Sequence, residues 1–115
     1  MIYHHFRCTL KAGVTAAERD AAIAGVREQA AQIEVVRHFV AGREIGGEFD
    51  LGATFAFEDL AAFQVYSSHP AHDRIIGIQL PLVERFVMYE TTDDPDPELP
   101  AKLATLYPAG RGTAR

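Results

Sequence analysis

The chain has 115 residues, of which 48% are apolar, and it carries a formal net charge of −5. This length fits one globular domain, and the excess of acidic over basic residues argues against nucleic acid as a partner, because phosphate contacts need clustered Lys and Arg. No apolar run reaches the roughly 20 residues of a membrane-spanning helix. Cys8 is the single cysteine, so an intrachain disulfide is excluded and a cytoplasmic location is expected.

The first predicted element is a strand over residues 2–10, where the side chains alternate with period two. One face of this strand carries His4, Phe6, Cys8 and Leu10. Because this face is the more apolar one, we expect it to point towards the helices of the domain. The polar side chain of His4 would then lie at the rim of that face.

The next predicted element is a helix that begins at a capping box. Thr15 and Glu18 have the residue types and the spacing of such a box, and the helix is expected to continue to about Gln32. Its buried face includes Ala22 and Val26, whose side chains are small. Small buried side chains either bring a helix close to the sheet or leave a hollow between the two.

Three further strands follow in the sequence. Residues 33–40 are rich in β-branched side chains, which favour a strand. Residues 51–57 alternate between larger and smaller side chains, and residues 83–90 form the last predicted strand of the domain. A glycine-containing turn is expected over residues 42–50, between the second and third strands.

A broken helix is predicted between the third and fourth strands. Residues 58–67 are expected to be helical, and a new helical segment begins with Pro70 at its first position and ends near Pro81. The resulting order is strand, helix, strand, strand, broken helix, strand. This order predicts an α+β fold, a ferredoxin-like βαββαβ subunit with its helices on one face of the sheet.

The second face of the predicted sheet needs a cover. Gly52, Thr54 and Ala56 lie on that face and carry no charge. A second copy of the same sheet covers such a face economically, so we expect a homodimer that pairs through the sheet face and forms a dimeric α/β barrel.

His5 and Arg7 are expected to point into that barrel, where apolar or small groups are more usual. Arg7 can pair there with Asp50 or Glu48, as part of a satisfied polar layer in the dimer. The alternative interpretation is an additional ligand site inside the barrel.

The composition changes after the last predicted strand, which divides the chain into a domain over residues 1–91 and a tail over residues 92–115. Residues 93–100 are acidic and rich in proline, so they read as an extended linker. Residues 101–107 can form about two helical turns. We expect this tail to be solvated, with a strap over a neighbouring subunit as the alternative.

The densest cluster of chemically active side chains lies around the helix break. Tyr66 ends one helical segment, and His72 lies in the first turn of the next, where the helix dipole disfavours the imidazolium form. A neutral His72 can act as a general base, while the Tyr66 hydroxyl can donate a hydrogen bond to a carbonyl or enolate oxygen. His4 can reach the same place from the first strand. The pattern suits proton abstraction beside a carbonyl group.

Other interpretations of these residues stay open. The two side chains can simply cap backbone groups and anchor the helix end. His4, His69, His72 and Asp73 can be read as metal ligands, although no established ligand pattern is present and we expect no metal. A non-catalytic protein that binds an apolar small molecule and a cofactor-free monooxygenase are further alternatives.

Short motifs along the chain resemble those of a known family. They are Met1-Ile2-x-His4, Lys11-x-Gly13-Val14-Thr15, Phe49-Asp50-Leu51, Phe57-Glu58-Asp59 and Tyr66-x-x-His69-Pro70-x-His72. Together they are similar to the stress-responsive dimeric A/B barrel family over residues 1–91. The last motif resembles polyketide cyclases of the olivetolic acid cyclase type within that family. This resemblance implies a homodimer with a cleft between sheet and helices in each subunit.

The same resemblance implies roles for individual residues, with no metal and no cofactor. It makes His72 the base, Tyr66 the orienting hydroxyl and His4 a third catalytic side chain of an aldol-type ring closure. The small residues on the first helix imply a different and bulkier substrate, hydrophobic or aromatic in character. The residues implied to contact the substrate are Phe6, Cys8, Ala22, Val26, Phe55, Phe63 and His69, the last of which lies near the helix cap.

Overall fold

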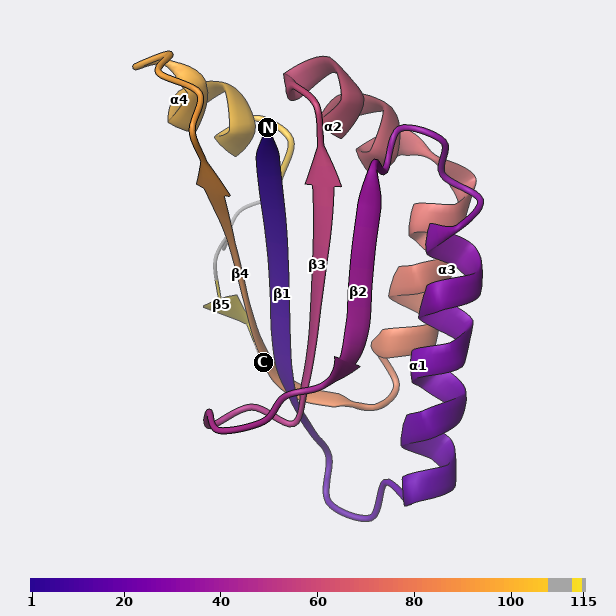
Figure 1. Cartoon of the computed structure of the whole chain (residues 1–115). Helices are drawn as coiled ribbons and strands as arrows, with labels where there is room; N and C mark the ends of the chain where they lie inside the picture. The colour runs from indigo at the N-terminus through magenta and orange to yellow at the C-terminus, as the bar shows by residue number, and fades with distance from the viewer. Residues whose placement is uncertain (108–112, 115) are drawn as a thin grey trace.

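The computed structural model describes residues 1–107 together with the short strand Thr113–Ala114. Figure 1 shows one twisted sheet with its helices packed against it. The elements are β1 Ile2–Leu10, α1 Ala16–Ala30, β2 His38–Arg43, β3 Leu51–Phe57, α2 Leu60–Ser68, α3 Pro70–Gln79, β4 Val83–Thr92, α4 Leu99–Ala104 and β5 Thr113–Ala114.

The sheet has the strand order β2-β3-β1-β4-β5, and every neighbouring pair is antiparallel. β1 lies in its centre, where His4 is opposite Phe55 of β3 and Glu90 of β4. Strands β1 to β4, with the helices between them, confirm the predicted ferredoxin-like α+β fold. Because paired residues share a face, this register brings His4 and Glu90 to the same side of the sheet.

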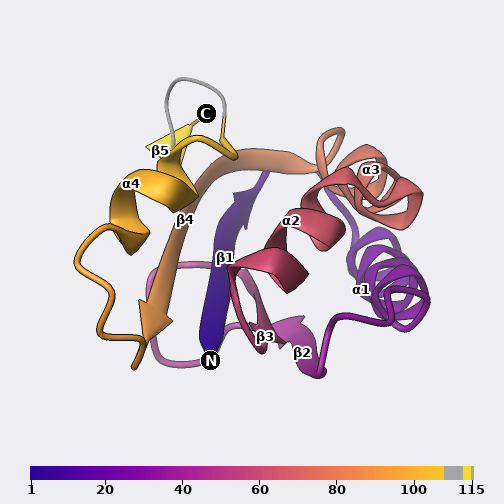
Figure 2. The ribbon, with the colours of Figure 1, turned by 90° about the horizontal axis from the view of Figure 1, so that it is seen from above.

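Helices α1, α2 and α3 cover one face of the sheet, and α4 lies at its β4 edge (Figure 2). The local sequence starts each main helix as expected. The Thr15 hydroxyl accepts from the Glu18 N–H in the predicted capping box, and Asp59 caps α2 by accepting from the Ala62 N–H. Pro70 is the first residue of α3, where its missing N–H costs nothing.

The second strand begins later than the sequence pattern suggested. Residues 33–37 do not form a strand, because hydrogen-bonded turns follow α1 and Ile33 donates its N–H to the carbonyl of Ala30. These turns place the Ile33 side chain in the core at 2% exposure. The β-branched residues at the start of the predicted strand therefore lie in turns and pack against the core, and they do not pair in the sheet.

The prediction of a solvated tail was wrong for residues 99–107. Leu99 and Leu103 on α4 are buried at 3% and 4% exposure, and Leu106 and Tyr107 pack against the same core. Hydrogen bonds to Asp96 connect the polar linker to the start of α4, since its carboxylate accepts from the Glu98 N–H and from Lys102 Nζ of that helix. The rest of the predicted tail, residues 108–112 and 115, lies outside the described residues.

The face of the sheet opposite the helices carries an ordered polar layer. His5 bonds through its two ring nitrogens to Thr54 and Thr91, each at 3.0 Å. Arg7 donates to Glu44 at 2.6 Å and to the Tyr89 hydroxyl at 3.0 Å. The predicted partners of this arginine were wrong, because the Asp50 carboxylate accepts the Leu10 N–H and Glu48 lies near Arg85.

Helices long and apolar enough to cross a bilayer are absent from the part of the chain that the structure describes.

Candidate active site

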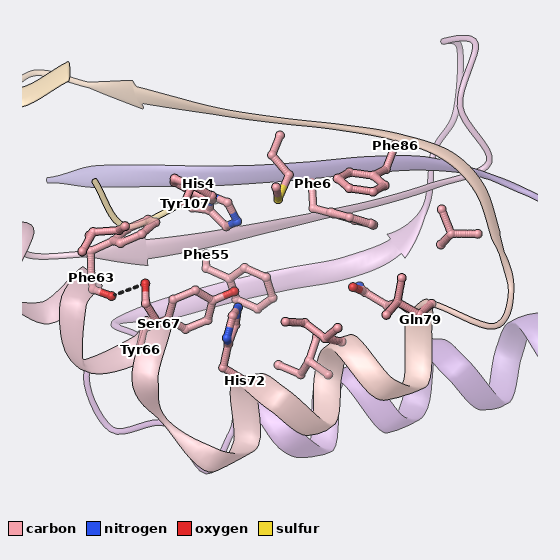
Figure 3. A pocket seen from close by; sticks show the side chains of 16 residues that line it. His4, Phe6, Phe55, Phe63, Tyr66, Ser67, His72, Gln79, Phe86 and Tyr107 are labelled. Atoms are coloured by element: carbon pink, nitrogen blue, oxygen red, sulfur yellow. Dashed lines mark hydrogen bonds between the residues drawn. The ribbon is translucent and has the colours of Figure 1, made fainter. Parts of the chain in front are cut away.

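A cavity of about 240 Å³ lies between the sheet and the segments α2, α3 and 106–107. Figure 3 shows side chains from β1, β3 and β4 on one wall and those from α2 and α3 on the other. Most of this lining is apolar, including Phe6, Phe55 and Phe63. The polar exceptions are His4, Tyr66, Ser67, His72, Gln79 and Tyr107. Such a space, apolar with a few polar groups, is typical of a small-molecule site.

The helix break between α2 and α3 brings Tyr66 and His72 together. His69 follows the last residue of α2 and caps the start of α3, where its ring Nδ1 accepts from the Ala71 N–H at 3.0 Å. The chain turns there, so that the Tyr66 and His72 rings meet edge to face with their centroids 4.6 Å apart. Both side chains line the cavity (Figure 3).

Burial sets the charge state of this pair. Desolvation lowers the pKa of His72, and the neighbouring His4 lowers it further, while Asp73 and the Ser67 backbone oppose the shift. Desolvation also raises the pKa of Tyr66, which is 4% exposed. His72 is therefore held as neutral imidazole and Tyr66 as protonated phenol. Within the described residues, the buried Nδ1 of His72 has no hydrogen-bond partner.

His4 joins the site through a buried polar network that sequence reasoning missed. Its Nδ1 lies 2.8 Å from Glu90 Oε2, and the Tyr107 hydroxyl lies 2.9 Å from that nitrogen. The Tyr107 hydroxyl also donates to Glu90 Oε2 at 2.7 Å. The His4 ring lies 6.0 Å from the Tyr66 ring between centroids, so Tyr66 stands in contact with both histidines.

Signals for the two missed residues exist in the sequence. Glu90 lies in the last predicted strand and falls opposite His4 once the antiparallel register is known. Tyr107 completes an apolar stripe with Leu99, Leu103 and Leu106 at spacings of a helix face.

The predicted substrate-contacting residues divide into three groups. Phe6, Phe55 and Phe63 line the main cavity. Cys8, Ala22 and Val26 surround a separate pocket of about 30 Å³ beneath α1, because the small side chains of that helix let it approach the sheet closely. His69 is occupied in capping α3 and does not line the cavity.

The alternative of a metal site gains no support from the geometry. Groups of three or more His, Cys, Asp or Glu suited to an ion do not occur among residues 1–107 and 113–114. His69 uses its Nδ1 on the backbone of α3, and the His4 Nδ1 is engaged with Glu90 and Tyr107.

Comparison with protein families gives one match that spans most of the chain. The model of the family described as "Stress responsive A/B Barrel Domain" matches residues 2–93. Among curated proteins no sequence matches this chain.

Solved structures share the fold at low sequence identity. A Dabb family protein with a ferredoxin-like fold from Mesorhizobium loti is 26% identical, with TM-score 0.71 over 81% of this chain and 96% of that one. A dimeric ferredoxin-like protein from Thermobifida fusca is 20% identical, with TM-score 0.73 over 79% and 89%. A hydroxynitrile lyase from Passiflora edulis is 15% identical, with TM-score 0.72 over 82% and 94%.

Proposed function

The chain belongs to the stress-responsive A/B barrel family, and from that premise we propose that it is a cofactor-independent enzyme acting on small molecules. Its reaction is proton abstraction beside the carbonyl group of an apolar or aromatic, enolisable substrate. Aldol-type ring closure, as in polyketide cyclases of the olivetolic acid cyclase type, is the form of this chemistry that we favour. The observation that carries the proposal is the contact between a neutral His72 and a protonated Tyr66 on the wall of an apolar cavity.

Each member of the pair has a distinct role in the reaction. His72 accepts the proton from the carbon next to the carbonyl, and the bonding electrons move onto the carbonyl oxygen. The Tyr66 hydroxyl donates a hydrogen bond to the enolate oxygen that forms, and its raised pKa keeps that proton in place. In an aldol step the enolate carbon then bonds to a second carbonyl carbon of the substrate. The protonated His72 returns its proton to the new alkoxide.

The apolar walls of the cavity favour this chemistry. Exclusion of water strengthens the hydrogen bond from Tyr66, because interactions in a low-dielectric environment are poorly screened. Phe55 and Phe63 offer flat faces to an aromatic or polyketide-like substrate. The hydroxynitrile lyase from Passiflora edulis supports the proposal in one respect, since the same fold carries a lyase there.

We further propose that the chain works as a cytoplasmic homodimer paired through the open sheet face. Val40 is 65% exposed on this face and Tyr89 is 41% exposed, which a second sheet would cover. The protein from Thermobifida fusca with the same fold is dimeric.

Deuterium exchange tests the catalytic proposal without knowledge of the natural substrate. The probe is 4-phenylbutan-2-one in D₂O, an aromatic methyl ketone whose exchange beside the carbonyl is followed by NMR. We expect the full-length chain to accelerate this exchange. His72→Ala should lower the rate by about 10²–10⁴-fold, and Tyr66→Phe by about 10²–10³-fold.

The matched control is His38→Ala, because His38 is an exposed histidine on β2 outside the cavity. Its exchange rate should equal that of the unaltered chain. A chain that binds the probe without accelerating exchange would overturn the proposal in favour of a non-catalytic binding protein.

A further inference from the structure

The segment over residues 94–107 lies beyond the part of the chain that the family model matches, yet it builds part of the cavity wall. Leu99 and Leu103 fix α4 in the core, and Leu106 and Tyr107 line the cavity. The Tyr107 ring lies 6.0 Å from the Phe63 ring between centroids, so it closes the space beside that side chain. The segment is therefore a structural component of the site.

The hydroxyl of Tyr107 takes part in a buried network rather than pointing to solvent. Side chains of both His4 and Glu90 are nearly inaccessible, at 5% and 4%. One carboxylate oxygen, Glu90 Oε2, lies within hydrogen-bond distance of both the Tyr107 hydroxyl and His4 Nδ1. Burying a carboxylate is costly unless donors surround it, so the hydroxyl contributes to the stability of this arrangement.

The same geometry defines which nitrogen of His4 carries a proton. A carboxylate oxygen only accepts hydrogen bonds, so His4 Nδ1 must donate to it. The hydroxyl proton of Tyr107 goes to Glu90, which leaves the phenol oxygen as a second acceptor for the Nδ1 proton. Two acceptors on one side of the ring hold the imidazole by its Nδ1–H edge, while the ring itself lines the cavity.

We propose that Tyr107 is a positioning residue of the site, which together with Glu90 holds His4 in one orientation with its proton on Nδ1. This inference rests on the proposed function for its catalytic consequence. It makes the C-terminal segment necessary for the arrangement of a site that otherwise lies within the family domain. The His4 ring then keeps one fixed orientation on the cavity wall, near the Tyr66 ring (Figure 3).

NMR of the full-length ¹⁵N-labelled chain tests the positioning. In the unaltered chain we expect a slowly exchanging His4 Nδ1–H resonance and contacts between the His4 and Tyr107 rings. In Tyr107→Phe, which keeps the ring and removes the hydroxyl, this resonance should shift and exchange faster with solvent. Tyr89→Phe is the control, because its hydroxyl bonds Arg7 on the opposite face of the sheet.

The outcomes separate the two proposals. An unchanged His4 Nδ1–H resonance in folded Tyr107→Phe would overturn the positioning role. The absence of contacts between the His4 and Tyr107 rings in the unaltered chain would overturn it as well, and that measurement requires no variant. If the ketone probe shows that the chain is not catalytic, the NMR result still decides the role of Tyr107. If it is catalytic, Tyr107→Phe should lower the exchange rate about tenfold with probe affinity unchanged, in keeping with one lost hydrogen bond to a charged group.

Discussion

The helices cover the sheet in two ways, tightly beneath α1 and loosely beneath α2 and α3. Under α1, the small side chains of Ala22 and Ala53 leave a pocket of only about 30 Å³, and Arg27 of the helix donates to the carbonyl of Ala41 at 2.9 Å. Under α2 and α3, Phe55 and Phe63 stand in the wall of a cavity of about 240 Å³. Small side chains let backbones approach, whereas rigid rings hold the layers apart and leave space between them.

The largest effect in this comparison is expected at a wall of the cavity. Phe63 is 1% exposed and contacts the rings of His4, Phe57 and Tyr66. Phe63→Ala should lower the free energy of unfolding by about 3–5 kcal/mol, because the new void joins a cavity that cannot collapse. Urea unfolding measures this loss. The control Phe49→Ala removes a half-buried ring from the segment between β2 and β3, and an equal loss there would contradict the expectation.

A paired enlargement distinguishes the tight region from the loose one. Ala53→Leu beneath α1 should destabilise the protein by about 1–3 kcal/mol, since no room remains for the added carbons. Ile75→Phe on α3 should cost less than about 1.5 kcal/mol, because its ring can enter the cavity, and it should abolish binding of 4-phenylbutan-2-one. Equal costs in urea unfolding, with binding retained in Ile75→Phe, would show that the two regions do not differ in packing.

The smallest effect concerns pH. His72 has a pKa below the ordinary histidine value of 6.5, so its unfolded form binds a proton where the folded form does not. Protonation of His72 in the unfolded chain therefore lowers the free energy of unfolding as the pH falls below 6.5. His72→Ala should remove this part of the pH dependence from the midpoints of urea unfolding. The rate of deuterium exchange should also begin to fall only at a pH below 6.5, because His72 stays neutral until the pH reaches its lowered pKa. A rate that already falls at a pH above 6.5 would contradict the lowered pKa of the buried His72.

Local sequence signals predicted the fold and part of the site. The alternation in β1 assigned His4 and Phe6 to the helix-facing side, and Pro70 marked the break that joins Tyr66 to His72. These features depend on neighbours in the chain or on a repeated pattern, which is why they can be read without coordinates.

The features that the sequence did not reveal depend on distance between elements. The small residues Ala22 and Val26 permitted either a hollow or a close approach, and only the assembled layers show the latter. Tyr107 reaches His4 across 103 positions of sequence after a polar linker, so no local pattern connects the two. Arg7 likewise pairs with Glu44, whose position depends on the path of the segment after β2.

The single thiol of the chain, that of Cys8, can report how often the helices separate from the sheet. Cys8 is buried on the helix-facing side of β1, and burial raises its pKa to about 12. The reactive thiolate is thus nearly absent at neutral pH, and a thiol reagent can modify Cys8 only when the helices lift from the sheet. The rate of that modification reports how often the native protein opens. A compound that fills the neighbouring cavity should slow the modification of Cys8, so the modification rate can also be used to detect ligand binding.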